Sequence, residues 1–112
     1  MMLRLAVNLF LGICIWLPVV SYALVQSAPN TIVIKDHQFN PSQLIVPVGQ
    51  KVQIIVDNQD PTAEEFESFD LDREQVVEGH KKITVFIGPL TAGTYNYWAD
   101  YHQDSKGVIV AK

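Results

Sequence analysis

The side chains best suited to chemistry in this 112-residue chain are a run of acids and one histidine beyond it. Nine carboxylates and a single base, Arg73, lie between residues 57 and 78, so this segment carries a charge of −8. Carboxylate oxygens are hard ligands that suit divalent and ferric ions. The same charges would also keep an exposed loop soluble, so the composition leaves two interpretations open, a cation site and a solvated loop.

The three histidines have different surroundings. His37 follows a predicted strand in a polar turn, which favours a structural or solvated role. His80 lies beside a lysine, whose charge disfavours a metal ion. His102 lies between Asp100 and Asp104, just past an aromatic strand, and is the histidine we expect to bind a metal or handle a proton. A structural hydrogen bond is its alternative role.

Composition excludes several other functions. The net charge of −4 argues against binding to a nucleic-acid backbone. The only cysteine is Cys14, so neither an intramolecular disulfide nor a cysteine-rich zinc or iron–sulfur site can form. The six glycines are scattered singly and build no phosphate loop, and no Ser/His/Asp set has support in the sequence. We therefore expect a binding protein and not an enzyme.

The N-terminus has the pattern of a secretory signal peptide. Arg4 is followed by an almost wholly apolar stretch over residues 5–20 and by the small-x-small triplet Ser21-Tyr22-Ala23. This stretch is shorter than the roughly 20 residues that a membrane span needs. We predict cleavage after Ala23, a signal peptide over 1–23 and an exported domain over 24–112; an uncleaved anchor is the alternative.

The predicted domain is all-β, because short β-branched or aromatic runs alternate with turn residues and no helical period persists. Seven strands at this spacing predict a Greek-key sandwich, with residue 47, a proline, at a sheet edge or bulge. The expected strands cover residues 31–34, 43–48, 51–56, 75–77, 83–87, 94–98 and 108–110. The acidic segment 61–73 is weakly patterned, and we expect a loop there with a turn of helix.

One stretch is similar to a known metal-binding loop. Residues 93–102, Gly-Thr-Tyr-Asn-Tyr-Trp-Ala-Asp-Tyr-His, resemble the C-terminal loop of cupredoxins, G-T-Y-x-[FY]-x-C-x-x-H followed by Met. The turn at 57–60 likewise resembles the turn before the other copper histidine. The resemblance places the loop histidine at His102, the cysteine at Ala99 and the upstream histidine near Glu65. A blue-copper centre needs a thiolate with two imidazoles, so we expect no electron transfer of that type.

A closer similarity extends over roughly residues 31–112. The segments 35–41, 46–50, 64–68, 88–95 and 107–110, with His102, resemble the EfeO-type cupredoxin-like domain, most specifically at Glu-Phe-Glu-Ser and Tyr…His…Gly-Val. This resemblance implies an exported protein that accompanies an iron permease of the bacterial inner membrane. Members with a cysteine copper site would carry the cysteines near Phe39 and Ala99, so that site is missing here. The ligand set that remains is Glu65, Glu67, Asp100 and His102.

Such a site requires two distant loops to meet. In a cupredoxin sandwich the turn after the third strand and the last hairpin lie at the same end, which would bring Glu65 close to His102. Alternation along extended chain would place Glu65 and Glu67 on one side, and Asp100 and His102 likewise. One imidazole with several carboxylates favours Cu(II), iron or manganese, and Cu(II) would bind most tightly of the divalent ions.

The sequence thus predicts an exported, periplasmic metal-binding protein that holds copper or iron and assists metal uptake. Two other classes stay open. One is a metal-free interaction domain whose acidic loop docks on a basic partner. The other is a small oxidase that works through one copper or iron ion.

Overall fold

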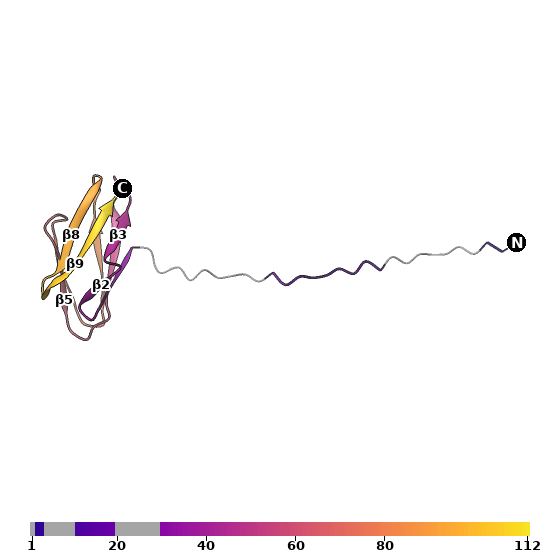
Figure 1. The fold of residues 1–112 in the computed structure, drawn as a ribbon, viewed down its shortest axis with the longest axis horizontal. Helices are drawn as coiled ribbons and strands as arrows, with labels where there is room; N and C mark the ends of the chain where they lie inside the picture. The colour runs from indigo at the N-terminus through magenta and orange to yellow at the C-terminus, as the bar shows by residue number, and fades with distance from the viewer. Residues whose placement is uncertain (1, 4–10, 20–29) are drawn as a thin grey trace.

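The computed structural model describes residues 2–3, 11–19 and 30–112. Within them, nine strands and no helix form two facing sheets (Figure 1). The strands are β1 (Thr31–Lys35), β2 (Gln38–Asn40), β3 (Gln43–Val46), β4 (Val52–Asn58), β5 (Glu64–Ser68), β6 (Arg73–Val77), β7 (Lys82–Ile87), β8 (Gly93–Ala99) and β9 (His102–Ala111). The described part of the chain has no helix of the length and apolarity that crossing a membrane requires. The predicted cleavage position after Ala23 lies outside the described residues.

The two sheets are mixed. The first has the order β2-β1-β4-β7, and the second has the order β3-β9-β8-β5-β6. The pairs β1–β4 and β3–β9 are parallel, and the other neighbours are antiparallel. β3 is an edge strand and stops just before Pro47, which agrees with the prediction for that proline because proline cannot donate to a ladder. The predicted all-β sandwich is confirmed.

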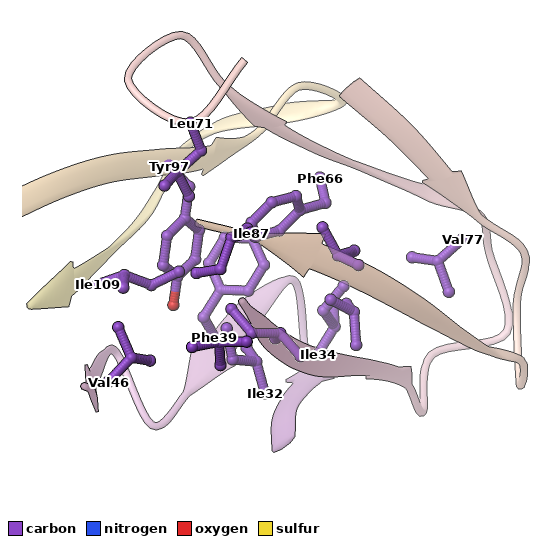
Figure 2. Close-up of a cluster of buried hydrophobic side chains, with 14 of the residues drawn as sticks. Ile32, Ile34, Phe39, Val46, Phe66, Leu71, Val77, Ile87, Tyr97 and Ile109 are labelled. Atoms are coloured by element: carbon purple, nitrogen blue, oxygen red, sulfur yellow. The ribbon is translucent and has the colours of Figure 1, made fainter. Parts of the chain in front are cut away.

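The core lies between the sheets and follows the period of two in each strand. In β4, Val52, Ile54 and Val56 are buried while the residues between them are exposed or half-buried. Buried side chains of both sheets form one cluster, and Figure 2 labels members from each sheet, such as Ile34 and Phe66. Each fully buried large apolar side chain contributes about 1.5–3 kcal/mol, so this layer can stabilise a domain without a disulfide.

Tyr97 is the largest side chain in that core. Its ring lies 4.9 Å, centroid to centroid, from the rings of Phe39 and Phe66 (Figure 2). Gly107, on β9, makes room for it, because a Cβ there would lie 2.2 Å from the Tyr97 Cζ. The Tyr97 hydroxyl is buried without a hydrogen-bond partner, and burial raises the pKa of this phenol.

The acidic segment differs from its prediction. Residues 61–73 contain no helical turn; instead they contain β5, which lies between β8 and β6. Glu64, Phe66 and Ser68 of β5 face the interior, so the strand does alternate. The alternation is hidden in the sequence because carboxylates occupy both of its faces. The three-residue β2 is the other strand that the sequence did not predict.

Candidate metal-binding site

Three chain segments meet at one end of the sandwich and carry the polar side chains of the candidate site. β1 and β2 are joined there by a two-residue turn that contains His37. β5 begins there at Glu64, and β9 begins there at His102, directly after the turn at residues 100–101. Because β1 and β4 run parallel, the loop that follows β4 reaches the same end and brings Asp60 with it.

The turn before β2 presents His37. Asp36 and His37 have φ values of 50° and 61°, the left-handed pair that a type I′ hairpin turn requires. Both amides donate to the Asp60 carboxylate, at 2.8 and 2.9 Å, which stabilises this uncommon conformation. Burial acts to raise the pKa of Asp60, but these hydrogen bonds and the nearby imidazoles outweigh it, so the pKa is lowered.

Asn58 holds the loop that supplies Asp60. Its side chain is fully buried and donates to the carbonyl oxygens of Thr62 and Val77, at 2.8 and 3.1 Å. Its Oδ1 accepts from the Asp60 amide at 3.0 Å. The loop is therefore fixed by a buried amide, and the position of the Asp60 carboxylate follows from it.

Glu64 is a buried carboxylate with three partners. Its side chain is 2% exposed. Oε1 accepts from the amides of Glu65 and Tyr101, each at 3.0 Å, and Oε2 is bonded to the Nδ1 of His102 at 2.5 Å. The carboxylate thus ties the start of β5 to the turn between β8 and β9.

The two imidazoles are stacked on each other. The His37 and His102 ring centroids are 3.6 Å apart with an interplanar angle of 18°, and the side chains are 43% and 39% exposed. One ring nitrogen from each histidine and an oxygen of Glu64 lie within 4.8 Å of one another. We call these three residues the imidazole cluster.

A second group lies on the outer face of the β5 sheet. Glu65 and Glu67 point there from β5, and one oxygen from each lies within 4.8 Å of an oxygen of Asp100. Glu74 stands opposite Glu67 in the β5–β6 ladder, and the indole of Trp98 donates to Asp100 at 3.3 Å. We call Glu65, Glu67 and Asp100 the carboxylate cluster.

Burial and neighbouring carboxyl groups disfavour the charged forms in the carboxylate cluster. A hydrogen bond with Glu74, burial and the neighbouring negative charges raise the pKa of Glu65. Burial, together with the hydrogen bond and charge of Asp100, raises the pKa of Glu67. Both carboxylates are therefore less stable as anions than isolated side chains would be, and a bound cation would relieve this repulsion.

The four ligands predicted from the sequence are thus divided between the clusters. Glu65 and Glu67 lie on the same side, as the alternation predicted, and Asp100 joins them. His102 instead faces Glu64, because the tight turn at residues 100–101 ends the extended alternation between Asp100 and His102. His37 and Glu64 were not predicted as ligands. The resemblance placed the upstream histidine position near Glu65, and the neighbouring Glu64 is the residue that contacts His102.

Comparisons with known proteins agree with this architecture. The family model of the cupredoxin-like domain matches residues 8–111. Uncharacterized protein RP394 of Rickettsia prowazekii (strain Madrid E) is 45% identical over 80 residues, which are 70% of this chain and 64% of that protein. The chain therefore spans less than two thirds of that relative's length.

Solved structures show the same fold. A novel purple cupredoxin from Nitrosopumilus maritimus is similar with a TM-score of 0.60 and 16% identity, over 73% of this chain and 98% of that one. A reduced Cu(I) form of an amicyanin mutant at pH 4 has a TM-score of 0.62 and 17% identity, over 80% of this chain and 87% of that one. The sandwich described above is thus of the cupredoxin type.

Proposed function

The chain belongs to the cupredoxin-like domain family, and from that premise we propose that it binds a metal ion, iron or copper, through carboxylates and histidine. The carboxylate cluster supplies the site for iron. The observation that carries this proposal is a buried oxygen without a partner. Glu65 is only 7% exposed, and its Oε1 makes no hydrogen bond. A cation among the three carboxylates would give that oxygen a partner.

The surroundings of the carboxylate cluster provide no basic partner for it. In residues 30–112, the side-chain ion pairs within 4.0 Å are His37–Asp60 and His102–Glu64. Arg73, the one base in the acidic segment, directs its guanidinium to the backbone carbonyls of Leu71, Asp72 and Phe86. The charge of the cluster is thus free to act on an ion.

The ligand chemistry favours a hard ion. Carboxylate oxygens suit Fe(III), Mn(II) and Mg(II) or Ca(II), whereas Cu(I) and zinc–thiolate sites use sulfur. Position 99, where the cupredoxin loop carries its cysteine, is a buried alanine. We therefore propose metal binding without blue-copper electron transfer and without catalysis.

The cellular role is proposed from the sequence. A basic start, an apolar stretch and the triplet at residues 21–23 support export to the periplasm with removal of residues 1–23. The similarity to the EfeO-type domain supports a role as an accessory to iron uptake, with an inner-membrane iron permease as partner. The mature protein would then capture the ion outside the inner membrane and present it to the permease.

Terbium offers a direct test, because Tb(III) is a hard ion whose luminescence is sensitised by a nearby indole. Trp98 donates to Asp100 and therefore lies beside the proposed ion. We expect sensitised Tb(III) luminescence when the purified protein is titrated with Tb(III), and Fe(III) citrate should displace the Tb(III) and quench it. In Glu67→Gln, neither the luminescence nor its displacement by Fe(III) should be seen. Asp57→Asn is the matched control, since it removes the same charge from β4 in the opposite sheet.

A protein that binds neither ion, or a Glu67→Gln variant that binds as well as Asp57→Asn, would refute the iron site. The acidic segment would then fit the other hypothesis, docking onto a basic surface of a partner protein. A pull-down between the protein and a basic periplasmic loop of the permease, with and without 0.5 M salt, would separate the two interpretations, because screening weakens exposed charge pairs.

A further inference from the structure

We propose that His37, Glu64 and His102 form a second metal site, separate from the carboxylate cluster, that binds a borderline divalent ion and binds Cu(II) most tightly. The site deepens the proposed function by assigning copper and iron to different ligands. It uses a histidine and a glutamate that the sequence did not indicate. Two imidazoles with one carboxylate suit Cu(II), Ni(II) or Zn(II), and the order of affinities places Cu(II) first.

The distances suit one ion. Metal–nitrogen and metal–oxygen bonds of about 2.0–2.2 Å place neighbouring ligand atoms roughly 3–4.4 Å apart. The three ligand atoms of the imidazole cluster already lie within 4.8 Å of one another. An ion there would replace the hydrogen bond between His102 Nδ1 and Glu64 Oε2, and the half-exposed rings of His37 and His102 would turn toward it.

The charge of the cluster matches a divalent cation. Glu64 is buried beside His102, and an oxygen of Asp60 lies 3.6 Å from the His37 Nδ1, so two carboxylates lie beside two imidazoles. Neither carboxylate has a lysine or arginine within 4.0 Å among residues 30–112. The side chains of His37 and His102 are partly exposed, so an ion can reach their ring nitrogens from solvent.

The surrounding backbone holds each ligand in place. Asp60 fixes the turn of His37 through two amides, and Glu64 is fixed by the amides of Glu65 and Tyr101. Partners of this kind orient metal ligands, and their loss costs about 10–100-fold in metal affinity. The backbone that carries the ligands of the imidazole cluster is thus held in place before any ion binds.

The two clusters lie on opposite faces of one strand. Glu64 and Glu65 are consecutive in β5, so their side chains point to different sides of the sheet. The interior face meets the imidazoles, and the outer face meets Glu67 and Asp100. The same two residues therefore offer an imidazole-containing site and an oxygen-only site within one segment.

Electron paramagnetic resonance of the purified protein with one equivalent of Cu(II) tests the proposal. We expect a copper spectrum without a thiolate band, with nitrogen splitting from two imidazoles. His37→Asn and His102→Asn should each reduce the splitting to one nitrogen. His80→Asn is the matched control, because His80 also has a positive φ, 56°, which asparagine tolerates, and belongs to neither cluster. Asp60→Asn should keep both nitrogens and weaken binding about 10–100-fold.

A spectrum that is unchanged in His37→Asn, or that loses a nitrogen in His80→Asn, would overturn the site. If His102→Asn does not fold, His37→Asn decides alone, since its side chain is 43% exposed and its turn suits asparagine. Glu67→Gln separates this proposal from the iron site. Loss of terbium binding with intact copper splitting supports both sites, and loss of copper splitting in Glu67→Gln would refute their separation.

Discussion

Glu64 should be important for folding as well as for metal binding, and two substitutions separate these roles. In the metal-free protein its Oε1 satisfies the amides of Glu65 and Tyr101, and its Oε2 is bonded to His102. Glu64→Ala removes all three acceptor contacts. Glu64→Gln keeps a carbonyl oxygen for the two amides and places an amide group beside the His102 Nδ1, which can accept a hydrogen bond in its other tautomer.

The expected magnitudes follow from these contacts. A buried donor that loses its acceptor costs about 1–3 kcal/mol. The hydrogen bond from the Glu65 amide is buried and the one from the Tyr101 amide is partly buried. Glu64→Ala should therefore lower the free energy of unfolding by about 2–4 kcal/mol. Glu64→Gln should lower the free energy of unfolding by about 1 kcal/mol or less, because this variant keeps a hydrogen bond to His102 and loses only the negative charge of Glu64. Both variants should bind Cu(II) more weakly.

Urea denaturation of the metal-free proteins in the presence of a chelator, followed by tryptophan fluorescence, gives the three free energies. The reasoning is refuted if Glu64→Ala is as stable as the unsubstituted protein, or if Glu64→Gln loses as much stability as Glu64→Ala. The first result would mean that water satisfies the two amides. The second would mean that the bond between the Glu64 carboxylate and His102, and not the hydrogen bonds from the two amides, stabilises this end of the sandwich.

Three further predictions concern pH and the core. Because the pKa of Asp60 is lowered, its carboxylate stabilises the fold above its unfolded pKa, near 4, and this stability is lost as the pH falls through the folded pKa. Thermal melts from pH 7 to 2 should show a fall in melting temperature that Asp60→Asn lacks. The raised pKa of Glu67 has the opposite sign: its charge destabilises the metal-free fold at pH 7, so Glu67→Gln should melt higher there, with a difference that fades as the pH falls toward 4. Tyr97→Phe removes a buried hydroxyl without a partner and should leave the free energy of unfolding unchanged or raise it by about 1 kcal/mol in urea denaturation.

The sequence predicted the sandwich because most strands alternate cleanly. β4, β7 and β8 present apolar side chains to one face, and the structure confirms those strands to within two residues at each end. β5 was not predicted as a strand, because its interior face carries the polar residues Glu64 and Ser68 as well as Phe66. A pattern built on hydrophobicity cannot find a strand that buries a carboxylate, since the hydrogen bonds that permit the burial come from other segments.

The contacts of His37 were not predicted from the sequence, for a different reason. A type I′ turn is ordinarily marked by Asn-Gly or Asp-Gly, and here it is formed by Asp36 and His37. What stabilises their positive φ values is the carboxylate of Asp60, 24 and 23 residues further along the chain. A contact of that separation leaves no local signal in the sequence, so the sequence predicted the polar turn but not the contact that holds it.

Which glutamate of β5 meets His102 depends on a single residue of register. The similarity to the cupredoxin loop placed the upstream ligand near Glu65, and the structure places Glu64 against His102. In a helix an error of one position would rotate a side chain by about 100°, but in a strand it moves the side chain to the other face of the sheet. The two adjacent glutamates therefore cannot substitute for each other. Glu65 faces Glu67 and Asp100 on the outer side of the sheet, so it cannot replace Glu64 as the buried partner of His102.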